Sequence, residues 1–159
     1  MSTQESPAGA GLVTDVADLA AHVGEELGHT EWQEMTQERV NQFADATNDH
    51  QFIHVDVERA KQTPFGGTIA HGYLSLSLMA YVMGELMHVS DAKMAVNYGL
   101  DRVRFPAPLP VGSQWRGGAE ILEVTDVPGG VQIKGKGTIE VQGQEKPACV
   151  AETLARIYG

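Results

Sequence analysis

The feature that most constrains the fold is a stretch without a single Asp, Glu, Lys or Arg, from residue 62 to residue 84. After a Gly-Gly turn, this stretch predicts a long apolar helix over residues 70–87. The stretch contains the polar residues Gln62, His71 and Ser75, and its purely helical part is about 17 residues long. Both features favour a buried helix over a membrane span. A helix that is apolar on nearly all faces must be covered on nearly all sides.

The segments on either side of this helix differ in their periodicity. Before it, the pattern predicts helices over residues 14–27 and 36–46, a short strand over 30–35 and a short helix over 56–62. After residue 90, four segments alternate or run apolar between Pro and Gly clusters: KMAVNYGL (93–100), WRGGAEILEVTDV (115–127), GVQIKGKGTIEVQG (130–143) and KPACVAETLARIY (146–158). These segments predict an antiparallel meander. The chain thus places short helices first, the long apolar helix in the middle and strands last. This order predicts an α+β fold in which a curved antiparallel β-sheet wraps around the long central helix.

Length and cysteine content limit the organisation of the chain. Its 159 residues are the size of one domain. The start, MSTQESPAGAG, lacks the basic and apolar regions of a signal peptide. We therefore expect a flexible tail over residues 1–13 and a single domain over 14–159. The only cysteine, Cys149, rules out an internal disulfide and favours a reducing, cytoplasmic location.

The charge is strongly acidic and unevenly distributed. The net charge is −10 and the pI is near 4.9, which argues against DNA or RNA as a partner. Residues 1–60 contain twelve Asp and Glu against two Lys and Arg, whereas residues 61–159 contain nine of each. An anionic ligand is therefore expected to meet the later part of the chain.

The segment DATNDHQFIHVD, residues 45–56, mixes ionisable and apolar side chains. Phe52 and Ile53 would anchor it to the core, so that Asp49 and His54 could face one cleft. A carboxylate and an imidazole can share one water and both remove and supply a proton. The alternative is that Asp49 caps the next turn and His54 is a hydrogen-bonded, partly buried histidine.

A second polar element opens the apolar helix. In FGGTIAHG, residues 65–72, Gly72 lies in or near the first helical turn. First-turn N–H groups have no helical partner, and glycine lets a ligand approach the backbone closely. This arrangement can form an oxyanion hole for a carbonyl. Alternatively, the glycines only permit a turn and close packing of the helix.

Together, the two elements resemble the hydratase-2 motif of the MaoC-like dehydratases, which include the (R)-specific enoyl-CoA hydratases. The resemblance rests on FADATNDHQFIHVD (43–56), PFGGTIAHG (64–72) and RVRFPAPLPVG (102–112), and it spans about residues 25–157. The form DHQFIHVD is similar to the nodulation-protein-N-like branch with a single hotdog. The family pattern has Gly-Asp-x-Asn-Pro-Leu-His, so Asn48 and Gln51-Phe52 depart from it.

The resemblance implies a hotdog fold and reversible hydration of trans-2-enoyl-CoA to (R)-3-hydroxyacyl-CoA. It assigns Asp49 and His54 as the catalytic dyad and the Gly72 N–H as the oxyanion hole. No cofactor is implied, since CoA is part of the substrate. The scattered histidines and single cysteine lack ligand-type spacing, so no metal site is expected. An open sheet edge and an open acyl cleft predict a homodimer or higher homo-oligomer.

Two rival functions remain open. A hotdog acyl-CoA thioesterase would need a carboxylate on or near the central helix, and the only acid there is Glu85, near its C-terminal end. A non-catalytic acyl-thioester-binding or structural subunit would not need the dyad.

CoA phosphates require a local positive patch in this acidic protein. Arg102 and Arg104 alternate along one predicted strand, and Lys134 and Lys136 along another, so each pair shares a face. At least one of the two pairs is expected to line the mouth of the cleft. The alternative is that all four are ordinary solvated strand residues.

Overall fold

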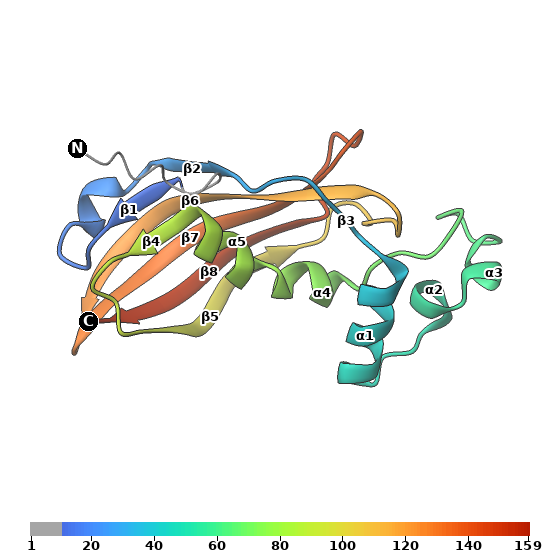
Figure 1. Cartoon of the computed structure of the whole chain (residues 1–159), viewed down its shortest axis with the longest axis horizontal. Helices are drawn as coiled ribbons and strands as arrows, with labels where there is room; N and C mark the ends of the chain where they lie inside the picture. The colour runs from blue at the N-terminus through green and yellow to red at the C-terminus, as the bar shows by residue number, and fades with distance from the viewer. Residues whose placement is uncertain (1–10) are drawn as a thin grey trace, which may run out of the picture.

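The computed structural model describes residues 11–159, in which a broken central helix packs against a large β-sheet and short helices lie at one end of that sheet (Figure 1). The strands are β1 Leu12–Thr14, β2 Glu26–His29, β3 Gln33–Glu34, β4 Met87–Val89, β5 Met94–Arg104, β6 Gln114–Val127, β7 Gly130–Val141 and β8 Cys149–Tyr158. The helices are the 3-10 helix η1 Leu19–His22 and the α-helices α1 Gln37–Thr47, α2 Phe52–Val55, α3 Val57–Ala60, α4 Gly72–Ser77 and α5 Met79–Leu86.

The main sheet contains the four strands that the sequence predicts. Its order is β2-β6-β7-β8-β5, with β3 also pairing with β6, and all of these pairs are antiparallel. The predicted meander holds for β6, β7 and β8 but is wrong for β5, which pairs with β8. The reason is connectivity: residues 128–129 join β6 to β7 and residues 142–148 join β7 to β8, whereas the chain reaches β5 from the central helix and enters at the far edge (Figure 1).

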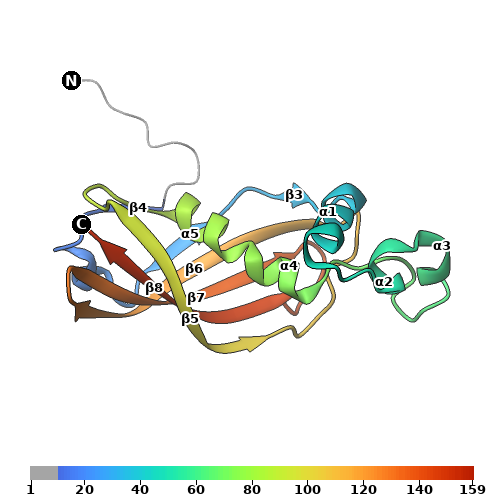
Figure 2. The same ribbon diagram turned by 90° about the horizontal axis from the view of Figure 1, so that it is seen from below.

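The central helix lies along the concave face of this sheet, as the predicted α+β hotdog arrangement requires (Figure 2). It is broken at Leu78 into α4 and α5 rather than continuous over residues 70–87. Glycines on the strands let the helix approach closely, because a Cβ on Gly117 would overlap Val82 and a Cβ on Gly137 would overlap the Met79 sulfur.

Within one chain, the sheet covers only one side of the central helix. Met79, Val82 and Leu86 are buried against the sheet. On the other side, Tyr73 is 71% exposed, and Ser77, Ala80 and Gly84 are exposed as well. The expectation that the sheet covers nearly all sides of the helix is therefore wrong for a single chain.

The described residues before β3 differ from the helix predicted over 14–27. They form β1, η1 and β2, with β1 parallel to β4 and β2 against β6. Leu19 and Leu27 are buried as the periodicity indicates, but Gly24 has a left-handed φ of 89° that ends any helix. Pairing with the edge of β6 outweighs local helix propensity here.

The helix predicted over 36–46 is α1, whereas the strand predicted over 30–35 and the helix predicted over 56–62 are present only as the shorter β3 and α3. Thr36 caps α1, accepting a hydrogen bond from the Arg39 N–H, and Asp56 caps α3 through Arg59. Residues 1–10 of the predicted tail lie outside the described residues, and Leu12 and Val13 belong to β1. Within residues 11–159, no helix is long and apolar enough to cross a membrane. The helices α1, α2 and α3 gather at one end of the sheet (Figures 1 and 2).

Candidate active site

Asp49 is placed by the end of α1. Asn48 adopts a left-handed conformation with φ 59°, a conformation that Asn tolerates. This turn brings the Asp49 N–H to the Ala44 carbonyl at 3.1 Å. The Asp49 side chain is half-exposed, and its Oδ1 accepts a long hydrogen bond from the Gln51 N–H at 3.4 Å. The carboxylate therefore keeps free acceptor capacity toward solvent.

His54 lies in the short helix α2 and is only 7% exposed. Its Nδ1 is 2.7 Å from the Ile69 carbonyl oxygen. Because a carbonyl can only accept, Nδ1 carries the proton, and in the neutral ring Nε2 has a free lone pair. Burial lowers the pKa of His54, with the nearby His71 acting in the same direction, while the Ile69 bond and Asp49 oppose them. His54 is thus held as a neutral ring with an available base at Nε2.

The backbone around His54 is held by a side chain from α1. Gln37 donates from Nε2 to the His54 carbonyl at 2.8 Å, and its Oε1 accepts from Thr68 Oγ1 at 2.6 Å. The Ile69 N–H in turn donates to the Ile53 carbonyl at 3.0 Å. These bonds connect α1, α2 and the segment that leads into α4.

His71 joins the two predicted dyad members. Its Nε2 is 3.0 Å from the Asp49 carbonyl oxygen, and its ring stacks on His54 with centroids 3.8 Å apart and 22° between planes. One polar side-chain atom from each of Asp49, His54 and His71 lies within 4.8 Å of the others. The structure therefore brings Asp49 and His54 together, with Gly72 next in the chain to His71.

Groups of this kind can hold a metal ion, but the geometry here is unfavourable. The two stacked ring planes are only 22° from parallel, so lone pairs that lie in these planes stay in two separate layers, whereas the ligands of one metal ion must converge on it. His54 Nδ1 and His71 Nε2 also already have backbone carbonyl partners. The absence of a metal site stays a prediction.

Gly72 begins α4, with His71 as the N-cap residue. Among residues 11–159, no acceptor meets its N–H within hydrogen-bonding distance. A Cβ on Gly72 would lie 3.2 Å from the Phe105 ring, tighter than ordinary van der Waals contact. The Gly72 N–H is therefore a free donor beside the His54–His71 stack.

Two apolar hollows extend from this point along the central helix. One, of about 230 Å³, is lined by residues including Leu76, Ser77 and Leu100; the other, of about 320 Å³, by residues including Met83, Met87 and Ala155. They share Met79, Ala80, Asn97 and Thr153. Leu76 is four residues from Gly72, about 6 Å along the helix axis. The hollows thus form one apolar trough that begins one turn beyond Gly72.

The four candidate cations are not arranged as two equivalent pairs. Arg102, Arg104 and Lys136 line a hollow of about 490 Å³ on the outer face of the sheet, together with Glu120 and Glu152. Lys134 instead lies 3.0 Å from Asp101, whose hydrogen bond raises the Lys134 pKa. Arg104 directly precedes Phe105, the residue that packs on Gly72.

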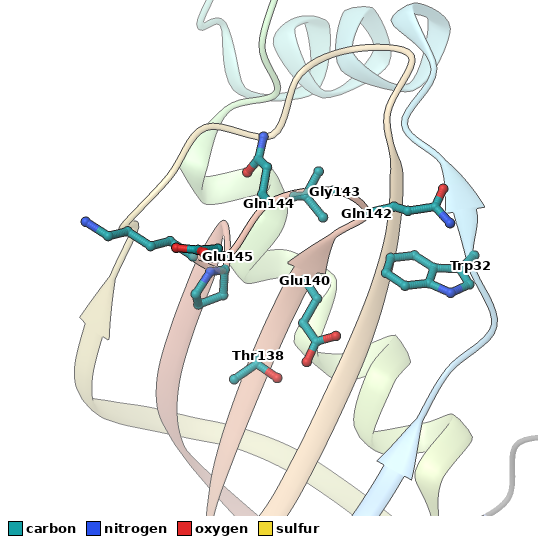
Figure 3. Close-up of a pocket in the computed structure, with 10 residues that line it drawn as sticks. Trp32, Thr138, Glu140, Gln142, Gly143, Gln144 and Glu145 are labelled. Atoms are coloured by element: carbon teal, nitrogen blue, oxygen red, sulfur yellow. The ribbon is translucent and has the colours of Figure 1, made fainter.

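A separate hollow of about 380 Å³ lies at the connection between β7 and β8, lined by Trp32, Thr138 and residues 140–147 (Figure 3). Its carboxylate, Glu140, is paired with Arg116 at 2.8 Å and with His29 at 3.3 Å. None of the residues that line it belongs to the Asp49–His54–Gly72 group, so it is not the candidate active site.

Sequence reasoning missed the supporting residues Gln37, Thr68 and the Ile69 carbonyl. Gln37 reads as an ordinary first-turn helix residue, and Thr68 as part of a turn. Their contacts span 17 and 31 positions in the chain, and no local pattern signals them.

Comparison with known proteins agrees with this architecture. The family described as the MaoC like domain matches residues 18–143. The 3-hydroxyacyl-thioester dehydratase Z of Mycobacterium tuberculosis is 53% identical over 142 residues, covering 89% of this chain and 94% of that protein. Nodulation protein N of Rhizobium leguminosarum bv. viciae is 41% identical, with coverage of 89% and 90%.

Solved structures show the same fold. The monoamine oxidase regulatory protein from Archaeoglobus fulgius superposes with a TM-score of 0.76 at 26% identity, covering 94% of this chain and 97% of that one. The R-hydratase PhaJ1 from Pseudomonas aeruginosa superposes with a TM-score of 0.70 at 21% identity, covering 86% and 81%. With the family match over most of its length, the chain belongs to the MaoC-like dehydratase family.

Proposed function

We propose that this protein is a 3-hydroxyacyl-thioester dehydratase that catalyses reversible hydration of trans-2-enoyl-CoA to (R)-3-hydroxyacyl-CoA. One observation carries the proposal: a buried imidazole with its Nε2 lone pair free lies beside a half-exposed carboxylate, next to an unpartnered helix N–H. The name and high identity of the mycobacterial relative support the substrate class.

The spacing of the dyad suits one water molecule. Two hydrogen bonds of about 2.8 Å that meet at a roughly tetrahedral angle span about 4.6 Å. An imidazole nitrogen of His54 and a carboxylate oxygen of Asp49 lie within 4.8 Å of each other. A water between them can donate one hydrogen bond to His54 Nε2 and the other to Asp49.

In the hydration direction, His54 Nε2 accepts a proton from this water while the water oxygen bonds to Cβ of the enoyl thioester. The electron pair of the C=C bond moves toward the thioester carbonyl, and Cα then takes up the proton that the dyad holds. The atoms of one water are thus added across the double bond. Dehydration follows the same steps in reverse.

The Gly72 N–H would stabilise the thioester oxygen as negative charge develops on it. A fixed donor at a helix start contributes more in the transition state than in the ground state, because the charge is larger there. The absence of a Cβ at Gly72 lets the Phe105 ring pack against this helix start, since a Cβ would lie 3.2 Å from that ring.

The acyl chain would follow the apolar trough that begins near Leu76, and the CoA phosphates would meet Arg102, Arg104 and Lys136. These three cations share that hollow with two carboxylates, Glu120 and Glu152, so its local charge is +1 in a protein of net charge −10. The role predicted for Lys134 is the weakest of the four, because Asp101 already engages its ammonium group.

The working unit is proposed to be a homodimer in the cytoplasm. The strand β5 pairs only with β8 among the described strands, and Met94, Val96, Tyr98 and Leu100 on it are exposed. A long apolar edge strand is prone to pair with another chain. A second copy that covers this edge would also cover the exposed side of the central helix.

The rival functions fit the structure less well. A thioesterase of the kind weighed above would need a carboxylate on the central helix, and Glu85 lies thirteen residues beyond Gly72, about 20 Å along the helix. A structural subunit would not need His54 to be buried with a fixed tautomer.

A coupled assay with crotonyl-CoA tests the proposal through the loss of enoyl absorbance, and chiral analysis of the product tests its stereochemistry. We expect an (R)-3-hydroxyacyl product. Thioester cleavage without hydration would favour the thioesterase, and neither reaction would favour the structural subunit. A predominantly (S) product would contradict the proposed orientation of water and thioester.

A further inference from the structure

His71 is a buried histidine that the proposed reaction does not use. It is 2% exposed and lies between two rings, 3.8 Å from the His54 centroid and 4.9 Å from that of Phe43. We propose that His71 is a positioning residue, which orients the His54 ring by stacking and the Asp49 turn by hydrogen bonding. This inference rests on the proposed function, because it assigns His71 a part in aligning that dyad.

The hydrogen bond to Asp49 fixes the His71 ring. The Asp49 carbonyl can only accept, so His71 Nε2 carries the proton. That bond holds the backbone of Asp49 directly, whereas the Asp49 carboxylate oxygen is 4.0 Å away and stays free. His71 therefore fixes the backbone position from which the Asp49 side chain extends, and it does not compete for the carboxylate oxygens.

The stack with His54 fixes the other dyad member. The Ile69 carbonyl anchors His54 at Nδ1 but leaves the ring free to rotate about that contact. A second ring packed at 3.8 Å and 22° restricts this rotation and so sets the direction of Nε2. One residue thereby controls the relative geometry of the water-binding groups.

A purely local role for the His71 side chain does not account for these contacts. His71 is the N-cap residue of α4, yet its side chain makes no capping hydrogen bond. Its backbone carbonyl accepts from the Leu74 and Ser75 N–H groups, as any residue could. An apolar side chain would fill the space equally well, but it would leave the Asp49 carbonyl without this donor.

The stack also bears on proton transfer. Two adjacent imidazole rings resist carrying charge together, and His71 acts to lower the pKa of His54. The other ionisable group that acts on His54 is Asp49, which has the opposite effect. Loss of the His71 ring would also admit water, which weakens the desolvation that keeps His54 neutral.

Two substitutions separate the two contacts. His71→Gln keeps an N–H donor near the Nε2 position and removes the stacked ring, whereas His71→Phe keeps a ring and removes the donor. Each is expected to lower kcat by about 10- to 100-fold with KM nearly unchanged, because misplacement by about 1 Å has effects of this size. His88→Gln, at an exposed position on β4, is the control and should retain wild-type kcat.

A direct measurement on His54 distinguishes failure of this inference from failure of the proposed function. Nuclear magnetic resonance of the imidazole nitrogens should show protons on His54 Nδ1 and His71 Nε2 in the wild type. In His71→Gln, the titration midpoint of His54 should rise toward 6.5, its ordinary value. These readouts need no substrate, so they hold even if the wild type lacks hydratase activity.

The inference would be overturned by an active wild type whose two His71 variants keep its kcat. It would also be overturned by an unchanged His54 midpoint in His71→Gln. If both variants fail to fold, the wild-type tautomers decide: a proton on His71 Nδ1 rather than Nε2 would exclude the proposed bond to Asp49.

Discussion

Substitution of His54 by Asn separates catalysis from stability at the centre of the site. The Asn amide nitrogen can occupy the place of Nδ1 and keep the hydrogen bond to the Ile69 carbonyl, which is 2.7 Å long in the native protein. The variant lacks Nε2, the proposed base. Loss of a general acid or base lowers kcat by about 10²–10⁴, which corresponds to about 2.7–5.4 kcal/mol of transition-state stabilisation.

The cost in stability should be much smaller. Loss of the stacked ring in a buried position is expected to cost about 1–2 kcal/mol. For a chain of this size that lowers Tm by about 2–8 °C. The assay is hydration of crotonyl-CoA at saturating substrate, with Tm measured by circular dichroism on the same preparation.

His54→Ala is the matched comparison. It also removes Nε2, but it leaves the Ile69 carbonyl without its donor, which costs about a further 1–3 kcal/mol. We expect the two variants to be equally inactive and the Ala variant to be clearly less stable. Turnover by folded His54→Asn within about threefold of wild type would refute the assignment of Nε2 as base, since removal of a base costs far more.

Four further predictions concern other parts of the molecule. Because the pKa of His54 is lowered, kcat/KM should keep its neutral-pH value at pH 6.5 and fall only below that pH. The free energy of unfolding should also fall below pH 6.5, since the unfolded chain then binds a proton at His54 that the folded chain excludes. An acid limb centred above 6.5 would contradict this. Replacing Arg102 and Arg104 by Gln should raise KM for CoA substrates and leave kcat nearly unchanged, and wild-type KM should rise with salt; flat KM values would point to another carrier. Burial raises the pKa of the Cys149 thiol to about 11, so thiol reagents should modify it only after denaturation. Sedimentation should give twice the 17.1 kDa chain mass, and Tyr98→Asp on β5 should shift it toward the monomer; a fully active wild-type monomer would exclude the dimer.

Some of the candidate site could be predicted from the sequence because its signals are local. Asp49 and His54 follow a capped helix within a few residues of each other, and Gly72 opens the next long helix. What the sequence could not indicate is how His54 is held. The Gln37 amide, the Ile69 carbonyl and the His71 ring reach His54 from 15 to 17 positions away in the sequence, and no local pattern indicates these contacts.

The fold, like the candidate site, could be predicted only where its signals are local in the sequence. The uncharged stretch over residues 62–84 and the alternating segments after residue 90 are enough to predict a helix packed against an antiparallel sheet, because burial of an apolar helix leaves few alternatives. Strand order is a different matter. Whether β5 pairs with β6 or with β8 depends on which edge of the sheet the chain reaches after the central helix, and no local sequence pattern indicates that edge.

The sequence by itself determined α1, the apolar segment of the central helix, the four long strands β5 to β8 and the chemical groups at the candidate site. The tertiary structure alone decided that residues 14–27 are not a helix, since the edge of β6 takes β2 as a partner. It also decided the protonation of His54, because one carbonyl oxygen at 2.7 Å fixes the proton on Nδ1 and burial keeps the ring neutral. The physical reason is range: helix and strand periodicities arise between neighbours in the chain, whereas pairing, burial and tautomer depend on groups that only folding brings together.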